Sequence, residues 1–103
     1  MRKKENIDPK VIMRAAVTLR VIAHPVRLRV IEALDKHGTM AVNDLMKVTG
    51  IGQAPLSKHL AVLRRKGIVR SKAVRNYRYY SIAKADVVNI LNCLRHHGKS
   101  EGG

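Results

Sequence analysis

Apolar residues recur at the three- and four-residue spacing of a helix in five segments of the chain, and β-branched and aromatic residues gather in a sixth. The helical spacing indicates amphipathic helices that each bury one face. It predicts helices over 9–22, 25–37, 43–49, 54–66 and 84–97, and the sixth segment predicts a β-hairpin over 68–82. The short stretch "TMAV" between the second and third helices tolerates β structure. The pattern therefore predicts a mainly α protein with one small β-hairpin.

Residues that favour helix ends stand at these boundaries. Asp8 is placed to cap the first helix, and Asn43 is placed to cap the short third one. Pro55 falls in the first turn of the fourth helix, where a missing amide proton leaves no hydrogen bond unmade. Glycines suited to ending a helix follow the second, third and fourth helices at Gly38, Gly50 and Gly67. The hairpin turn at Arg75-Asn76 lacks the glycine that two-residue turns prefer.

Length and composition indicate one domain, over 8–98. The chain has 103 residues, of which 46% are hydrophobic, and this is enough for a single core. Residues 1–7 are charged and aperiodic, which predicts a flexible basic arm, and 99–103 are predicted to form a disordered tail. We find no apolar run that could act as a secretion signal or span a membrane. The single cysteine excludes a disulfide within the chain, so we expect a cytoplasmic protein with no membrane partner.

The distribution of charge indicates which class of partner the protein binds. The formal net charge of +14 exceeds what solubility requires and favours a polyanionic partner, nucleic acid ahead of a membrane surface. No acidic residue lies between Asp44 and Asp86. Ten basic residues do: Lys47, Lys58, Arg64, Arg65, Lys66, Arg70, Lys72, Arg75, Arg78 and Lys84. The fourth helix and the hairpin therefore carry the basic surface.

The order of the elements matches a winged helix-turn-helix. A short helix joined by a tight turn to a longer basic helix is the helix-turn-helix plan, and the hairpin that follows is the wing. A helix fits the DNA major groove, where its first residues reach base edges while nearby cations neutralise phosphates. Motifs for catalysis are not found: there is no glycine-rich phosphate loop, nucleophile motif or pair of carboxylates. We therefore expect double-stranded DNA as the partner, no enzymatic activity and no cofactor.

Three segments in the same order carry a family resemblance. "LRVIAHPVRLRVIEAL" (19–34), "PLSKHLAVLRRKGIV" (55–69) and "NYRYYSI" (76–82) resemble the winged-helix repressors of the ArsR/SmtB family. The resemblance covers about residues 11–97. It implies a homodimer built from the first and last helices, a palindromic operator, and release from DNA when an effector binds. In such a dimer the two recognition helices would lie about 34 Å apart, one turn of DNA.

The resemblance also assigns roles to residues. In the recognition helix Gln53, Ser57, Lys58 and His59 correspond to groove-facing positions, and in the wing Arg75, Asn76 and Arg78 correspond to DNA contacts. We add Arg64, Arg65 and Lys72 as basic neighbours; the two arginines could instead form a solvated helix end beside the helix dipole. His59 could instead pack or contact a phosphate. The predicted dimer interface is Val11, Ile12, Ala15, Leu19, Val87, Ile90, Leu91 and Leu94.

This sequence differs from the family pattern at the residues that sense effectors in other members. The segment "AVNDL" holds no cysteine pair for a soft metal, and of the interface metal site only Asp86 and His97 remain as ligand types. A metal effector stays possible, with an incomplete ligand set. Cys93 is a candidate redox residue, which could act only through a bond between protomers or as a modified thiol; the alternative is a small apolar core residue.

Two other functions remain open at this stage. A basic RNA-binding or ribosome-associated module could use the same fold, and so could a nucleoid protein that binds DNA without sequence preference. Competition between an operator, bulk DNA and structured RNA separates the three.

Overall fold

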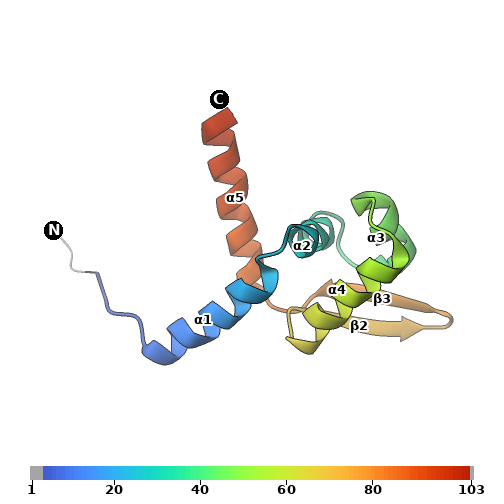
Figure 1. Ribbon diagram of the computed structural model, residues 1–103, viewed down its shortest axis with the longest axis horizontal. Helices are drawn as coiled ribbons and strands as arrows, with labels where there is room; N and C mark the ends of the chain where they lie inside the picture. Colours follow the sequence, from blue (N-terminus) through green and yellow to red (C-terminus); the bar gives the residue numbers. More distant parts are fainter. Residues whose placement is uncertain (1–3, 103) are drawn as a thin grey trace.

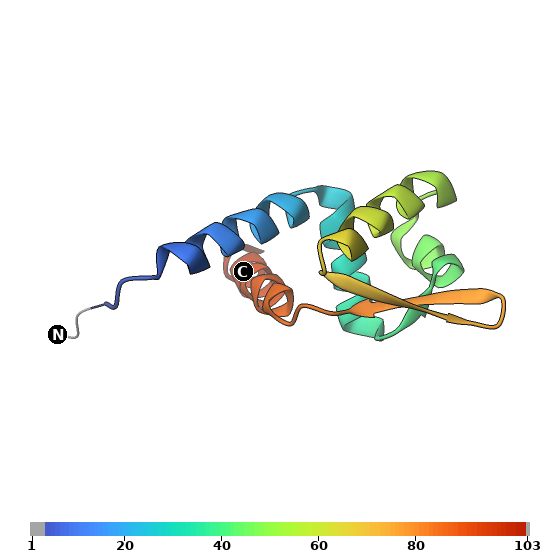
Figure 2. The same cartoon turned by 90° about the horizontal axis from the view of Figure 1, so that it is seen from below.

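The computed structural model describes residues 4–102, with the side chains described for 4–98. It confirms the predicted winged helix-turn-helix. The elements are α1 (Pro9–Ile22), α2 (Pro25–His37), β1 (Met40–Ala41), α3 (Val42–Thr49), α4 (Gln53–Arg65), β2 (Val69–Val74), β3 (Tyr77–Ile82) and α5 (Asp86–Gly102). Helices α1 and α5 lie at one end of the molecule, and the hairpin tip lies at the other (Figures 1 and 2).

The strands form one antiparallel sheet in the order β1-β3-β2. Strands β2 and β3 pair from Val69 opposite Ile82 to Val74 opposite Tyr77, which confirms the predicted hairpin. The two residues of β1 pair with Tyr79 and Tyr80, so "TMAV" supplies a third strand in the sheet. Arg75 takes a φ of 57°, in the left-handed region that a glycine usually occupies. The turn is therefore made without glycine, with strain placed on an exposed arginine.

Most of the predicted helix ends are confirmed. The Asp8 carboxylate accepts from the Lys10 amide at 2.8 Å, as a cap does. Gly50 ends α3 at a φ of 73°. The prediction that Asn43 caps α3 is wrong: the helix begins at Val42, Ala41 precedes it, and no side chain caps it. The pairing of β1 with β3 brings the chain directly into the helix, so Asn43 falls within the first turn and is exposed.

Helix α5 is longer than predicted. It begins at Asp86 and continues to Gly102, past the end expected at His97, so the disordered tail predicted for 99–103 is wrong for 99–102. Glycine weakens a helix interior without preventing it, which is why Gly98 does not end the helix. Of the predicted arm over 1–7, residues 4–7 are exposed and outside any helix, and residues 1–3 lie outside the described part of the chain. Residue 103 also lies outside it.

The core lies where α2, α3, α4 and the sheet meet. Its fully buried members are Val30, Ile31, Leu45, Leu56, Leu60, Leu63, Ile68, Val69 and Val87. The three leucines of α4 lie at the spacing of one helix face, so the opposite face of α4 turns to solvent. Burying each of them contributes about 1.5–3 kcal/mol relative to leaving it exposed. The core thus fixes which residues of α4 a ligand can reach.

Candidate nucleic-acid interface

The turn between α3 and α4 is held by one buried threonine. The Thr49 hydroxyl donates to the Leu45 carbonyl at 2.6 Å and accepts from the Ile51 amide at 3.3 Å. Its side chain is only 4% exposed, so both bonds replace contacts with water that the group has lost. The left-handed Gly50 then turns the chain into α4. These contacts set the angle at which α4 leaves the turn.

The outward face of α4 carries the predicted groove residues. Gln53, Ser57, Lys58, Arg64 and Arg65 are all exposed. Gln53 and Ser57 lie one turn apart in the first half of the helix, while the two arginines lie at its end. The first half of the helix therefore exposes polar side chains, and its last turn exposes positive charge.

His59 differs from the other predicted groove residues. It is half-buried, and its Nδ1 accepts from the Arg27 Nε at 3.1 Å. Its ring lies against the ring of His24, with 4.5 Å between the ring centroids. The histidine thus packs against the start of α2, as its alternative interpretation held. Burial first, then the nearby charges of His24 and Arg27, lower the pKa of His59 below its ordinary value of 6.5.

The wing presents its cations on an open surface. Lys72, Arg75, Asn76 and Arg78 are all exposed. Arg78 Nη1 donates to the Ser71 Oγ on the paired strand at 2.9 Å, which ties the guanidinium to the hairpin. Among the described residues, no cation of α4 or of the wing forms an ion pair with an acidic side chain. Their charge is available to a polyanion.

A groove of about 310 Å³ joins the recognition helix to the wing. It is lined by Ala41, Val42, Asn43, Gln53, Ser57, Asn76, Tyr77 and Arg78. The fold therefore brings together four of the predicted residues, Gln53, Ser57, Asn76 and Arg78, from two separate elements. Arg64, Arg65 and Lys72 do not line it.

Two residues of this groove were not predicted from the sequence. Asn43 was assigned to a helix cap, although its exposure at the start of α3 places its amide in the groove. Tyr77 is 57% exposed between two wing residues that were predicted. An exposed aromatic side chain among cations is a common feature of nucleic-acid surfaces, and the run "RNYR" carried that signal.

The predicted dimer residues divide into two groups. On α1, Val11, Ile12, Ala15 and Leu19 are exposed, and on α5 Leu94 is 50% exposed. Val87 and Leu91 are buried within the chain, so their assignment to the interface is wrong. They lie on the side of α5 that packs on the core, and Ile90 is partly buried beside them. Only Val21 and Ile22 of α1 are buried, which leaves most of its apolar stripe uncovered.

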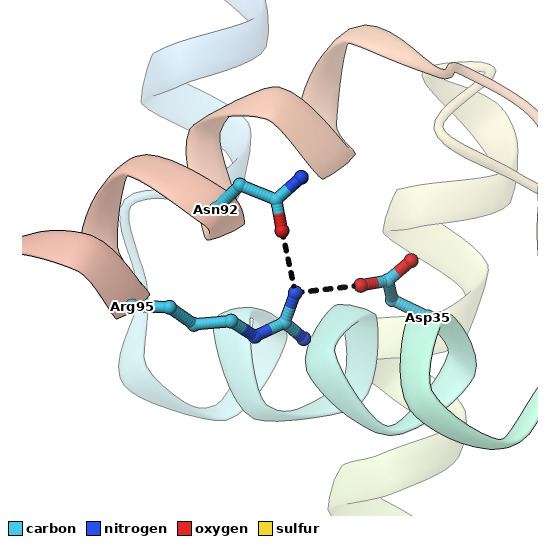
Figure 3. A network of polar contacts seen from close by, with 3 residues as sticks. All are labelled: Asp35, Asn92 and Arg95. Atoms are coloured by element: carbon cyan, nitrogen blue, oxygen red, sulfur yellow. Dashed lines mark hydrogen bonds and ion pairs between the residues drawn. The ribbon is translucent and has the colours of Figure 1, made fainter.

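Helix α5 is fastened to α2 by a polar network (Figure 3). Arg95 Nη1 lies 2.8 Å from both the Asp35 carboxylate on α2 and the Asn92 amide oxygen on α5. The pair is partly exposed and contributes about 0.2–1 kcal/mol. It links α5 to α2 in addition to the packing of Val87 and Leu91 on the core.

The candidate sensing residues lie on α5. Cys93 is a free, exposed thiol, so the interpretation as a core residue is wrong within this chain. Asp86 and His97 are exposed and eleven residues apart, about 16 Å along a helix, so one chain cannot bring both to a single ion. Among the described residues no three His, Cys, Asp or Glu side chains are grouped to hold a metal. Within the same residues, no helix is long and apolar enough to cross a membrane.

The fold and this surface define a winged helix-turn-helix protein that binds DNA. A sequence profile of bacterial regulatory proteins of the arsR family matches residues 24–71. The biofilm growth-associated repressor of Xylella fastidiosa is 36% identical over 76 residues, which span 74% of this chain and 66% of that protein. The transcriptional repressor PagR of Bacillus anthracis is 32% identical over 79 residues, or 77% of this chain and 79% of PagR.

Solved structures agree with these relatives. The crystal structure of PagR covers 84% of this chain and 99% of its own, with a TM-score of 0.76 and 28% identity. The antimony-specific repressor AntR covers 97% of this chain and 93% of its own, with a TM-score of 0.84 and 25% identity. The chain belongs to the ArsR family of bacterial regulatory proteins, and it is a DNA-binding transcriptional regulator. It spans about two thirds of the length of the Xylella relative.

Proposed function

We propose that this regulator is a repressor that acts as a homodimer on a palindromic operator in the bacterial cytoplasm, and that an effector releases it. The observation that carries the proposal is the groove between α4 and the wing, which joins polar side chains able to read bases to cations without acidic partners. Gln53 and Ser57 enter the major groove, and Arg75 and Arg78 hold the flanking backbone or minor groove. The chain has no proposed catalytic role.

The uncovered apolar stripe of α1 supports the homodimer. Ile12 and Leu19 are 51% and 49% exposed, and the stripe continues through Met13 and Val17. An apolar surface of this extent on a small chain is typical of an interface. Two copies joined there would present two equal DNA-binding surfaces, which is why a two-fold symmetric operator is the matching partner.

Binding to the DNA upstream of the chain's own gene tests the proposal. Fluorescence anisotropy at fixed salt, with bulk DNA and structured RNA as competitors, measures the preference for that duplex. We expect a dimer whose affinity for that duplex exceeds its affinity for bulk DNA by a factor of about 10³ or more. A preference near one would indicate a nucleoid protein, and equal competition by RNA would indicate an RNA-binding module; either result refutes the proposal.

Two variants locate the contact. Ser57→Ala is expected to reduce binding to the operator by about 1–3 kcal/mol while leaving binding to bulk DNA unchanged, because it removes a base contact. Ser81→Ala, further along β3 and not among the residues that line the groove, is the matched control and is expected to bind as the wild type does. Repeating the binding with reduced protein, oxidised protein and added zinc separates thiol, metal and other effectors.

A further inference from the structure

Three helices meet at one arginine behind the DNA-binding face. Arg27, on the first turns of α2, donates from Nη1 to the Val21 carbonyl at the end of α1, at 2.9 Å. It donates from Nε to the His59 Nδ1 on α4, at 3.1 Å. One planar guanidinium group thus connects α1, the helix with the uncovered apolar stripe, to the recognition helix α4. Arg27 is not itself among the predicted DNA contacts, whereas its partner His59 is.

The bond to α1 has a clear physical basis. Val21 is the penultimate residue of α1, so its carbonyl has no partner within the helix. A guanidinium there satisfies the carbonyl and also lies at the negative end of the helix dipole. The planar fork of arginine lets the same group donate in a second direction, which a lysine cannot reproduce with fixed geometry.

The bond to α4 requires one protonation state of His59. Because Nδ1 accepts a hydrogen bond from a permanent cation, it carries no proton, and the ring is neutral with its proton on Nε2. His24 is held in the same way: its Nδ1 accepts from the Val26 amide at 3.1 Å and caps α2. A proton on His59 Nδ1 would face the Arg27 N–H and add a positive charge beside His24 and Arg27.

We propose that Arg27 is a positioning residue for DNA recognition: through His59 it fixes α4 relative to α1, and protonation of His59 releases that link. The groups that face His59 are the charged Arg27 from α2 and the titratable His24 from the α1–α2 junction. Both oppose protonation, so the link is closed at neutral pH and opens as the solution is acidified. The proposal rests on the proposed function only for its readout on the operator.

Substitutions at His59 separate the hydrogen bond from packing. Asparagine places its Oδ1 where the histidine has Nδ1 and does not titrate, so His59→Asn keeps the acceptor and removes the proton switch. His59→Leu fills the same space and removes the acceptor. At pH 7.5 we expect His59→Leu to show an operator preference about tenfold lower than that of His59→Asn, as expected for the loss of one bond with a charged donor.

A matched pair at α2 separates position from charge. Arg27→Ala and Arg29→Ala each remove one positive charge, but Arg29 is exposed two residues along α2 and makes neither contact. Arg29→Ala is expected to leave the preference for the operator over bulk DNA as it is in the wild type. Arg27→Ala is expected to weaken binding to the operator about tenfold more than binding to bulk DNA. Should Arg27→Ala unfold, Arg27→Lys keeps the charge and should show the same selective loss.

A pH series completes the test. The operator preference of the wild type should fall as the pH drops below 6.5, and that of His59→Asn should stay level. Equal behaviour of Arg27→Ala and Arg29→Ala, or of His59→Asn and His59→Leu, would overturn the proposal. NMR of the DNA-free protein gives an independent reading: ¹⁵N shifts should report the Nε2–H form of His59, and α4 amides should exchange faster in Arg27→Ala than in Arg29→Ala. If the wild type shows no operator preference, the proposed function fails and these NMR results alone decide on the link.

Discussion

Replacing Arg78 by alanine tests the wing with little disturbance of the fold. Its side chain is exposed, and its one described hydrogen bond, to the Ser71 hydroxyl, lies on the surface of the hairpin. Removing an exposed side chain of this kind changes the free energy of unfolding by no more than about 0.5 kcal/mol. Any larger change in DNA binding therefore comes from the complex.

The size of the effect follows from counterion release. Each phosphate neutralised by a cation adds about 0.9 to the slope of log K against log salt. Between 1 M and 0.15 M salt, one such contact is worth RT × 0.9 × ln(1/0.15), about 1 kcal/mol. The proposed dimer would use two wings, so Arg78→Ala should lower the slope by about 1.8 and weaken binding about thirtyfold at 0.15 M salt.

Anisotropy titrations at five salt concentrations, with operator and bulk DNA, measure both quantities. Lys36→Ala is the matched control, because Lys36 is an exposed cation near the end of α2 that does not line the groove. It should leave the slope unchanged. If Arg78→Ala bound with the slope of the wild type, or lost affinity for the operator alone, the wing would not hold the backbone and the reasoning would be wrong.

Three further predictions concern the stability of the fold, the proposed dimer, and the dependence of stability on pH. Thr49→Val leaves the Ile51 amide without its acceptor and should lower the free energy of unfolding by about 1–3 kcal/mol in urea, whereas Thr39→Val, at an exposed position, should change it by less than about 0.5. Leu19→Glu should convert the dimer to a monomer in sedimentation velocity without loss of helical circular dichroism, and a dimer that persisted would refute the α1 interface. Because the folded protein lowers the pKa of His59, the contribution of His59 to stability is complete above pH 6.5 and is lost as the pH falls. The His59→Asn variant should therefore lose less stability than the wild type between pH 7.5 and 5. Equal losses in the two proteins would contradict this.

The fold was predictable because its signals are local. Asp8, Pro9 and Pro25 mark helix starts, and the leucine spacing of α4 fixes its buried side and hence its exposed one. The wrong predictions concern features that depend on tertiary contacts. Asn43 has the chemistry of a cap, yet strand pairing at Met40–Ala41 starts the helix one residue before it. The apolar spacing of α5 does not say which residues meet the core, so Val87 and Leu91 were assigned to a partner.

The sequence predicts which residues belong to the site, but it does not predict how they are arranged in space. Spacing places Gln53 and Ser57 on the outer face of α4, but only the folded hairpin brings Asn76 and Arg78 to the same groove. His59 shares the sequence neighbourhood of those residues and nonetheless turns inward. Its orientation depends on Arg27, which lies 32 residues away in the chain. No periodicity within α4 carries that information.

The two helices at the end opposite the wing are both tied to α2. Helix α1 is joined to it through Arg27 and the Val21 carbonyl, and α5 through Asp35 and Arg95. Since α2 also packs on α4, a change in how α1 and α5 pair with a second copy in the proposed homodimer can reach the recognition helix through these contacts. An effector alters DNA binding only by the difference in its affinity for the two arrangements. The proposed release by an effector therefore does not require a complete metal site on α5, because a ligand that favoured one pairing of these helices in the proposed homodimer would shift DNA binding in the same way.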